Sequence, residues 1–292
     1  AERAAVLSKA DLATSFVVEM TSLQGIMGGQ YALNSGETPA VAQALSEQYE
    51  AVSSTGPSLA LALSDRIDSL VGLFAAGLAP KGSNDPFALR RAALHLIENL
   101  IANEVRLDLR PVLAATAELM PVPADAAVRQ AVMDFVAGRL EVVLRDQGAP
   151  THVVRAVLAE QAHDPYAASE AVTALAEAQG TPEWGQLLDA VARCARITRG
   201  EDRQHELRPD NFTLPAEQAL LAAYEKAAGD VDGTVPTFVS SLRVLEPAIT
   251  RFFDDVLVMD DDMAVRHNRQ ALLQRVEDMA LRVADMSELE GF

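Results

Sequence analysis

Apolar residues recur along most of the chain at the spacing of one helical face. Between residues 59 and 78 they fall three and four positions apart, and Pro80 ends the pattern, which predicts an amphipathic helix. A second helix is predicted from Pro86 to about Val105, because Asp85 and Pro86 suit the N-cap and the first position of a helix. The residues predicted to form its buried stripe are Leu94, Ile97, Ile101 and Val105.

Prolines and glycines divide the rest of the chain into shorter predicted helices. Breaks fall near residues 121–123, 148–150, 163–165 and 180–182. The polar stretch 200–215 holds two prolines and is predicted to be a loop or an insertion. The last helix is predicted from about Asp262 to Asp285, and its inward residues are Leu272, Leu273, Val276, Met279 and Val283. Strand-like alternation is almost absent, so the pattern predicts an all-α fold.

The start of the chain bears on its organisation. Helical periodicity already runs through Ala4, Leu7 and Leu12 with no cap before it, so we expect a chain cut from within a longer protein. The pair Gly28-Gly29 suits either a close helix contact or a turn. A length of 292 residues suits two domains, or one domain with a helical extension.

Composition narrows the class of protein. The apolar fraction of 49% and the charged fraction of 23% are ordinary for a soluble globular protein. No stretch approaches the ~18 uninterrupted apolar residues of a membrane span, and the N-terminus lacks the apolar core of a secretion signal. The single cysteine, Cys194, cannot form an internal disulfide or a cysteine-based zinc site. We therefore expect a protein of the reducing cytoplasm with no membrane partner.

The net charge of −18 argues against a nucleic-acid ligand, because dedicated binders usually have a basic balance. Binding would need local clusters of cations that release counterions where phosphates dock. Lys81, Arg90 and Arg91 form one candidate cluster, because they flank the start of a predicted helix, where phosphate oxygens are favoured. Arg90 also lies on the apolar stripe, so an ion pair with a buried carboxylate is an equal alternative for it.

Two further groups of arginines lie in the C-terminal third. Arg193, Arg196 and Arg199 spread over roughly a third of the circumference of a helix with ~3.6 residues per turn. They either contact phosphates or form a solvated face that complements the helix dipole. Arg266 and Arg269 share a face of the last predicted helix. The acidic run just upstream of them would repel phosphate, although it could also cap that helix.

No complete active site emerges from the sequence. None of the five histidines forms HExxH or lies four residues from another on one helix, so a catalytic zinc is not expected. Asp65 and Asp68 are three residues apart, and paired carboxylates can bind Mg²⁺ or Mn²⁺. As alternatives, they form a solvated face or pair with Arg66. Phosphate-binding loops and motifs of nucleophilic hydrolases are absent.

Three segments of the chain resemble one family. The first is KADLATSFVVEMTSLQGIMGGQYAL, the second is LALSDRIDSLVGLFAAGLAPKGSNDPFALRRAAL, and the third is FFDDVLVMDDDMAVRHNRQALLQRVEDMALRVADMSEL. In this order they resemble segments of the β subunit of bacterial heterotetrameric glycyl-tRNA synthetase. They span nearly the whole chain apart from a divergent middle, and the combination of QGIMG, DPFALRR and LRVAD is specific.

The resemblance implies a fold and a function. Residues 1–80 would form the back half of an HD-like helical domain, residues 81–165 a connecting helical region, and residues 166–292 a helical-bundle anticodon-binding domain of DALR type. A separate α subunit would hold the aminoacylation site and use ATP and Mg²⁺, so this chain is expected to bind no cofactor and to carry no catalytic residue. The implied partners are tRNA(Gly) and the α subunit.

The resemblance also directs the choice of site residues. The predicted tRNA contacts are Lys81, Arg91, Arg193, Arg196, Arg199, Arg266 and Arg269, while Arg90 is either a tRNA contact or part of a structural ion pair. Asp65 matches the last aspartate of an HD-type metal site, but one ligand cannot hold a metal. Two alternatives stay open: a degenerate HD-type metal phosphohydrolase that uses Asp65 and Asp68, and a helical module that docks the α subunit through an exposed apolar patch.

Overall fold

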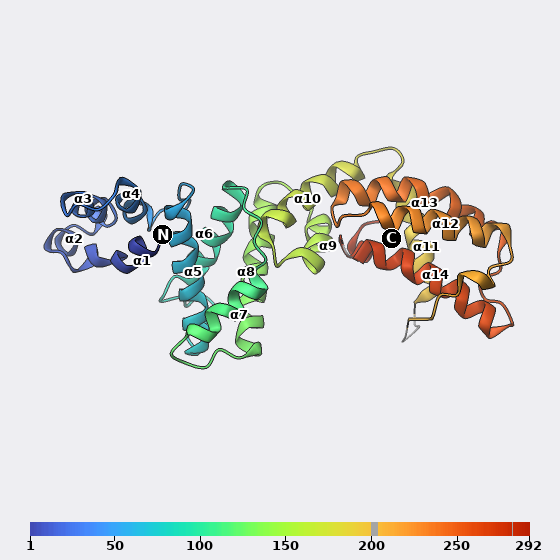
Figure 1. Ribbon diagram of the computed structural model, residues 1–292, viewed down its shortest axis with the longest axis horizontal. Coiled ribbons are helices and arrows are strands. Elements are labelled where there is room, and N and C mark those ends of the chain that lie inside the picture. The colour runs from blue at the N-terminus through green and yellow to red at the C-terminus, as the bar shows by residue number, and fades with distance from the viewer. Residues whose placement is uncertain (200–203, 282) are drawn as a thin grey trace. The chain divides into compact units, whose positions relative to one another are not determined.

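The computed structural model describes residues 1–199, 204–281 and 283–292 (Figure 1). Helices joined by turns and loops make up this part of the chain, and it contains no β-strand, only an isolated bridge between Lys81 and Asn84. The predicted all-α fold is therefore confirmed. Within the described residues, no helix is long and apolar enough to cross a membrane.

The chain divides into two compact units. The first comprises residues 1–143 and 163–166, and the second comprises residues 144–162 and 167–292. Helices of the first unit are α1 (Glu2–Leu7), α2 (Ser15–Glu19), α3 (Ile26–Asn34), α4 (Pro39–Glu47), α5 (Pro57–Ala75), α6 (Leu89–Ala102) and α7 (Leu109–Leu119). Those of the second are α9 (Thr151–Gln161), α11 (Trp184–Thr198), α12 (Pro215–Asp230), α13 (Val235–Asp255) and α14 (Met263–Leu281). Residues of α8 (Ala126–Asp146) and α10 (Pro165–Gln179) belong to both units. The three-part division at residues 80 and 165 stays a prediction.

Short single-turn 3-10 helices connect some of these elements. They are η1 (Ala10–Ala13), η2 (Thr21–Leu23), η3 (Pro209–Asn211) and η4 (Met286–Glu288). Of the stretch that was predicted to be a loop, residues 204–214 are irregular except for η3, and residues 200–203 lie outside the described part.

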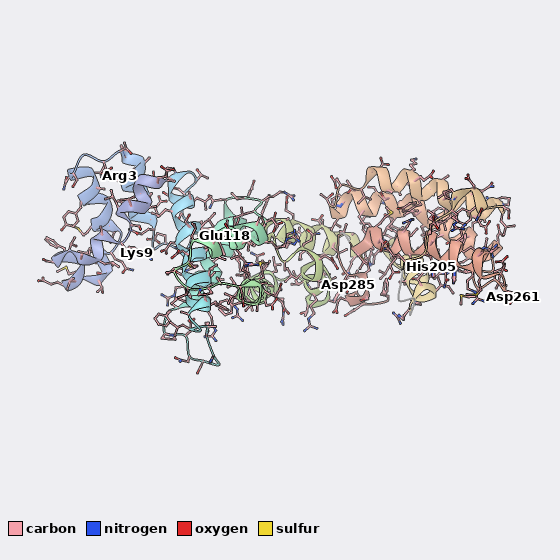
Figure 2. The ribbon with its side chains drawn as sticks, turned by 60° about the horizontal axis from the view of Figure 1, so that its bottom comes forward. Arg3, Lys9, Glu118, His205, Asp261 and Asp285 are labelled. Atoms are coloured by element: carbon pink, nitrogen blue, oxygen red, sulfur yellow. The ribbon has the colours of Figure 1, made fainter. Side chains whose placement is uncertain are left out.

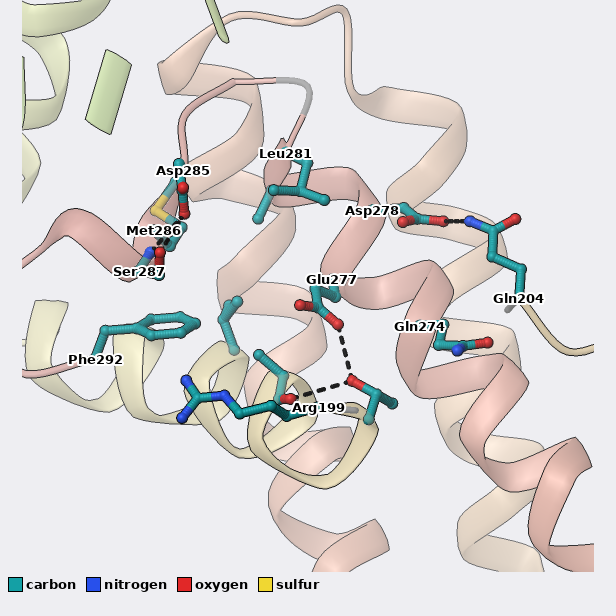
Figure 3. Close-up of a pocket in the computed structure, with 14 residues that line it drawn as sticks. Arg199, Gln204, Gln274, Glu277, Asp278, Leu281, Asp285, Met286, Ser287 and Phe292 are labelled. Carbon is teal, nitrogen blue, oxygen red and sulfur yellow. Dashed lines mark hydrogen bonds between the residues drawn. The ribbon is translucent and has the colours of Figure 1, made fainter. Parts of the chain in front are cut away.

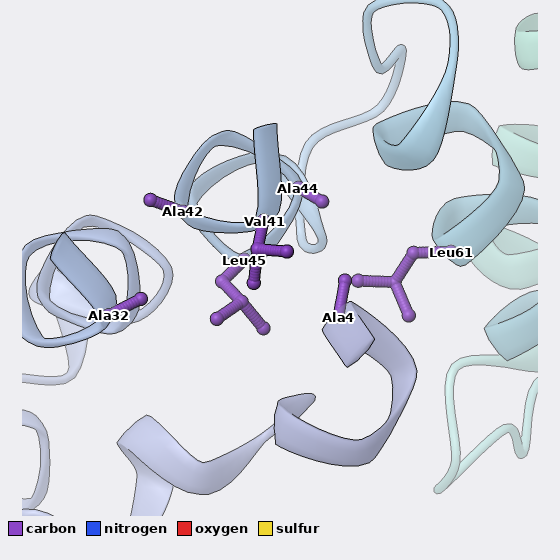
Figure 4. Close-up of a cluster of buried hydrophobic side chains, with 7 residues drawn as sticks. All are labelled: Ala4, Ala32, Val41, Ala42, Ala44, Leu45 and Leu61. Atoms are coloured by element: carbon purple, nitrogen blue, oxygen red, sulfur yellow. The ribbon is translucent and has the colours of Figure 1, made fainter. Parts of the chain in front are cut away.

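Small side chains bring the first helices of the N-terminal unit together. The buried cluster consists of Ala4 of α1, Ala32 of α3, Val41, Ala42, Ala44 and Leu45 of α4, and Leu61 of α5 (Figure 4). An alanine projects only a methyl group, so helices that meet through alanines can approach closely while the interior stays densely packed.

Gly29 lies at the contact between α3 and α4. A Cβ atom added there would lie 2.1 Å from Ser46 Oγ and 2.9 Å from the carbonyl oxygen of Ala42. One at Gly28 would lie 3.3 Å from the Cβ of Asp11. Of the two alternatives for the Gly28-Gly29 pair, the structure therefore shows the close helix contact and not the turn.

Asp11 links the two halves of the first family segment. Its buried carboxylate accepts the N–H of Gly25 at 2.7 Å and the hydroxyl of Tyr49 at 3.0 Å. Gly25 has a φ of +78°, which a residue without a side chain adopts at low cost. Burial, together with the hydrogen bond to Asp11, raises the pKa of Tyr49, so the tyrosine stays a neutral donor to this carboxylate.

The connection between α4 and α5 is held by two buried polar side chains. Arg66 of α5 donates to the carbonyl oxygens of Gln48 at 3.0 Å and Glu50 at 2.7 Å. Asn99 of α6 donates to the Ala51 carbonyl at 2.7 Å and accepts from the backbone of the same loop. Side chains of α5 and α6 thus supply hydrogen-bond partners to the backbone of this loop. Arg66 pairs with backbone oxygens here, not with Asp68, which is exposed.

Helix α6 begins later than the sequence predicted. The Asp85 carboxylate does cap it, accepting the N–H groups of Leu89 at 2.8 Å and Arg90 at 3.0 Å. However, the residues between Asp85 and Leu89 form a turn that ends with Ala88 at φ +53°, so Asp85 is not the N-cap residue. The buried hydrophobic residues of α6 are Leu89, Ala93, Leu96, Ile97 and Leu100, and of the predicted stripe only Ile97 is fully buried.

The C-terminal helix agrees more closely with its prediction. All five predicted inward residues are buried, from Leu272 to Val283. The helix itself ends at Leu281 and not at Asp285. Asp285 is instead the N-cap of η4 and accepts the N–H of Ser287 at 2.9 Å.

Gly29→Ala is expected to destabilise the contact between α3 and α4 by about 1–3 kcal/mol, because the added methyl group overpacks a filled space. The measurement is hydrogen exchange of the α3 and α4 amides, which should become faster. Gly138→Ala in α8 is the matched control, since a Cβ there meets nothing within 4 Å and alanine favours a helix. Equal protection in both variants would show that α3 and α4 are not tightly packed at Gly29.

Candidate nucleic-acid interface

The first cluster of predicted contacts surrounds the start of α6. Lys81 and Asn84 close a tight turn through two backbone hydrogen bonds, and the Lys81 side chain is exposed. Arg91 is exposed on the first turn of α6. Neither cation forms an ion pair with another described residue, so both stay open to an anionic ligand.

Arg90 is engaged with the same turn. Its guanidinium donates to the carbonyl oxygen of Gly82, and its Nη1 lies 3.8 Å from the Asp85 carboxylate. Arg90 thus has an ion-pair partner, but the Asp85 carboxylate is half-buried and is not the buried carboxylate of the alternative stated for this residue. Arg90 fastens the turn that presents Lys81, and a direct contact with RNA stays a prediction.

The aspartate pair on α5 is split between two environments. The Asp65 carboxylate is half-buried and forms an ion pair with Lys9 (labelled in Figure 2), whereas Asp68 is exposed. Among the described residues, no group of three or more histidine, cysteine, aspartate or glutamate side chains is placed to hold a metal ion. The hypothesis of a metal phosphohydrolase therefore gains no further ligand from this part of the chain.

The second group of predicted arginines lies in α11 or directly after its last residue, and its three members have different surroundings. The guanidinium of Arg193 lies 4.6 Å from the ring centroid of Phe253, at a distance typical of a cation–π contact. Arg196 is exposed and lies 3.6 Å from the carboxylate of Asp189, which is itself exposed, so this pair contributes little to stability. Arg199 ends the helix, is exposed, and forms no ion pair with the other described residues.

Arg199 also lines a cavity of about 550 Å³ between α11, α14 and the C-terminal residues (Figure 3). Thr198 donates to Glu277 at 2.9 Å in its wall, and Gln204 donates to Asp278 at 2.7 Å. Asp285 lines it as well, so three carboxylates face one described cation. Carboxylates therefore outnumber cations among the described residues of this cavity.

Arg269 of α14 is buried in an ion-pair network. Its Nε donates to Glu217 at 2.6 Å, and its Nη1 donates to the carboxylate of Asp260 at 2.8 Å and to the carbonyl of Leu257 at 2.9 Å. The side chains of Arg269 and Glu217 are only 8% and 3% exposed. Arg269 thus faces the interior and is not presented to a phosphate, so it is not part of the proposed interface.

Arg266 lies beside the same network. Its Nε donates to the carbonyl oxygen of Asp260 at 2.9 Å, and its side chain is half-buried. The structure therefore brings Arg266 and Arg269 together at Asp260. The acidic run also caps α14, because the Asp262 carboxylate accepts the N–H of Ala264 at 2.8 Å, as the sequence suggested.

One arrangement was not anticipated from the sequence. The imidazole rings of His205 (labelled in Figure 2) and His267 stack with their centroids 4.2 Å apart and their planes inclined by 9°. They line a cavity of about 250 Å³ together with Glu206, Arg208, Asn211, Ala264 and Asn268. One histidine belongs to the loop before α12 and the other to α14, and no spacing rule connects them.

Known proteins resemble this chain along its length. A family model described as "Glycyl-tRNA synthetase beta subunit" matches residues 1–159. The glycine–tRNA ligase β subunit of Desulforudis audaxviator is 39% identical over 303 residues, which cover 99% of this chain and 44% of that protein. The β subunit of Marinobacter nauticus is also 39% identical, with the same coverage over 304 residues.

A plant protein is similar as well. The chloroplastic/mitochondrial glycine–tRNA ligase 2 of Arabidopsis thaliana is 35% identical over 302 residues, which cover 100% of this chain and 28% of that protein. All of these relatives are aminoacyl-tRNA synthetases or subunits of one. The chain belongs to the glycyl-tRNA synthetase β-subunit family, and it spans less than half the length of the relatives it matches.

Arg269→Met is expected to lower the free energy of unfolding of the C-terminal unit by about 3–5 kcal/mol, because it leaves the Glu217 carboxylate buried without its partner. Denaturation is followed by the fluorescence of Trp184, the single tryptophan, which is buried in this unit. Arg266→Met is the control and should cost about 1 kcal/mol or less. Similar unfolding midpoints for both variants would contradict the structural role of Arg269.

Proposed function

We propose that this chain is a tRNA-binding portion of a glycine–tRNA ligase, and that it supports the glycylation of tRNA(Gly) by a separate α subunit. Membership of the β-subunit family carries the proposal. In this proposal the α subunit holds the aminoacylation site and uses ATP and Mg²⁺. The described chain contributes binding surface, in the N-terminal unit through an HD-like part and in the C-terminal unit through an anticodon-binding bundle.

The exposed cations supply the contacts that position the RNA. Lys81 and Arg91 lie on the N-terminal unit, and Arg196 and Arg199 lie on the C-terminal unit. Phosphate contacts of this kind fix the orientation of a nucleic acid, whereas contacts to bases select its sequence. Since the chain carries a net charge of −18, we expect a small number of phosphate contacts and a correspondingly modest dependence of binding on salt.

The double variant Arg196→Ala, Arg199→Ala is expected to weaken tRNA binding and to flatten its salt dependence. Each lost phosphate contact should reduce the slope of log K against log[salt] by about 0.7–0.9. The measurement is filter binding of tRNA(Gly) at several salt concentrations, with the full-length β chain and the α subunit present.

The control for this experiment is the double variant Arg243→Ala, Arg251→Ala. It removes the same charge from exposed arginines of α13, which pair with Glu183 at 2.6 Å and Asp255 at 3.3 Å. If both double variants change the slope equally, the effect is one of net charge and the contacts proposed on α11 are wrong. If the wild-type complex itself fails to bind tRNA, the proposed function is overturned.

A second candidate function, docking of another protein, rests on a separate observation. Large apolar side chains are exposed throughout the first elements of the N-terminal unit, and these residues are Val6, Leu12, Phe16, Val18, Met20, Ile26 and Leu33. Phe16 is 57% exposed and Val18 66% exposed. Large exposed apolar side chains mark a protein–protein contact when they form one patch. We propose that these residues form such a face and that this face docks the α subunit.

Phe16→Asp combined with Val18→Asp is expected to weaken the complex of the full-length β chain with the α subunit by at least tenfold, because charges at an apolar contact lose their hydration. Size-exclusion chromatography of the mixed subunits measures the complex. Leu119→Asp is the matched control, since Leu119 is 81% exposed but lies on α7. An intact complex in the double variant would remove the α subunit as the occupant of this face.

A further inference from the structure

Hydrogen bonds join the two segments that carry His205 and His267. The buried side chain of Asn268 accepts the N–H of Arg208 at 2.7 Å and donates to the carbonyl oxygen of Arg208 at 3.1 Å. The backbone N–H of His205 donates to Gln274 of α14 at 2.9 Å. The loop that carries His205 is therefore fastened to the helix that carries His267, which keeps the two residues side by side.

The cavity beside the stack is small and mixed in character. Its volume of about 250 Å³ lies below the ~300–1,000 Å³ of clefts that hold drug-sized ligands, which suits a single ring system. Two imidazoles supply aromatic surface, and the exposed side chain of Asn211 supplies an amide. Amides form paired hydrogen bonds with the edges of bases.

Arg208 supplies a positive charge at the same cavity. Arg208 is exposed, and its guanidinium pairs at 2.8 Å with the carboxylate of Glu206, which is also exposed. Exposed pairs of this kind are weak, so a phosphate could replace Glu206 as the partner of Arg208. Aromatic surface, an amide and an arginine are the groups with which proteins bind unpaired nucleotides of RNA.

The geometry of the stack disfavours a metal ion as the ligand. The lone pair of an imidazole nitrogen lies in the plane of its ring, and a bound metal lies about 2.0–2.1 Å from that nitrogen. The planes of His205 and His267 are almost parallel, with the ring centroids 4.2 Å apart, so their lone pairs do not converge on one ion. Within the described residues, no third ligand completes such a site.

We infer that this cavity, called here the histidine cavity, binds one unpaired base of an RNA strand. The base stacks with the imidazole pair, Asn211 contacts its edge, and Arg208 contacts an adjoining phosphate. The inference rests on the proposed function, because tRNA is the RNA that this chain is proposed to hold. It adds a site for a base that is distinct from the phosphate contacts proposed on α11.

His267→Ala tests the histidine cavity in the complex of the full-length β chain with the α subunit. Loss of base stacking is worth about 1–3 kcal/mol per base, so the dissociation constant for tRNA(Gly) should rise roughly 5- to 150-fold. The slope of log K against log[salt] should not change, because no phosphate contact is lost. Arg208→Ala should instead lower that slope by about 0.7–0.9.

A chemical footprint of the bound tRNA distinguishes the loss of one base contact from a general loss of folded protein. In the wild-type complex one unpaired nucleotide should be protected at its base, and this protection should disappear in His267→Ala while the rest of the footprint stays. His267→Phe should restore both protection and affinity, because phenylalanine keeps an aromatic face. His152→Ala is the matched control, since His152 lies elsewhere in the same unit and bonds to Gln179 at 3.1 Å.

The possible results separate the site from the proposed function. Normal affinity and an unchanged footprint in His267→Ala would overturn the histidine cavity while leaving tRNA binding intact. A phenylalanine variant as weak as the alanine variant would show that stacking is not the interaction. A wild-type complex that does not bind tRNA would overturn the proposed function, and the histidine cavity with it.

Discussion

The buried contact between Arg269 and Glu217 fixes several parts of the C-terminal unit at once. Glu217 uses one carboxylate oxygen for Arg269 and the other for the N–H groups of Thr213 and Leu214, at 2.9 Å each. It therefore caps the start of α12 and also balances the charge of the Arg269 guanidinium on α14. Because a charge is expensive to bury without partners, this network constrains the start of α12, the start of α14 and the segment that follows α13.

Buried polar side chains also connect the elements of the N-terminal unit, where most of their partners are uncharged. Asp11, Arg66 and Asn99 are buried, and most of their hydrogen bonds go to backbone groups of loops and helix ends. Such bonds satisfy main-chain groups that cannot reach water. In both units, therefore, a few buried polar side chains hold the connections in place, while the helices supply the apolar interior.

The sequence predicted the parts of the fold that depend on local spacing. The all-α class and the buried face of α14 follow from apolar periodicity, which a single segment contains in full. The start of α6 did not follow, because Asp85 caps the helix across a turn in which Ala88 takes a positive φ. The buried face of α6 differs as well, since Leu96 and Leu100 are buried where Leu94 and Ile101 were expected.

The candidate site was harder to predict than the fold. Spacing placed Arg266 and Arg269 on one helix, but whether a guanidinium faces water depends on Glu217, which is 52 residues away in the chain. The histidine stack likewise joins a loop and a helix that are distant in sequence. Contacts of this kind leave no periodic trace, and only the packing of the elements reveals them.

The alanine-rich cluster of α1, α3 and α4 has a consequence for motion. Free energy from apolar burial scales with the area removed from water, at roughly 25 cal/mol per Å², and an alanine methyl removes little. These short helices therefore gain less from their contacts than α5 and α6, whose cores contain Leu70, Leu96 and Leu100. The segment from α1 to α4 is thus expected to open and close as a separate cooperative segment, while α5, α6 and the loop held by Arg66 and Asn99 stay folded.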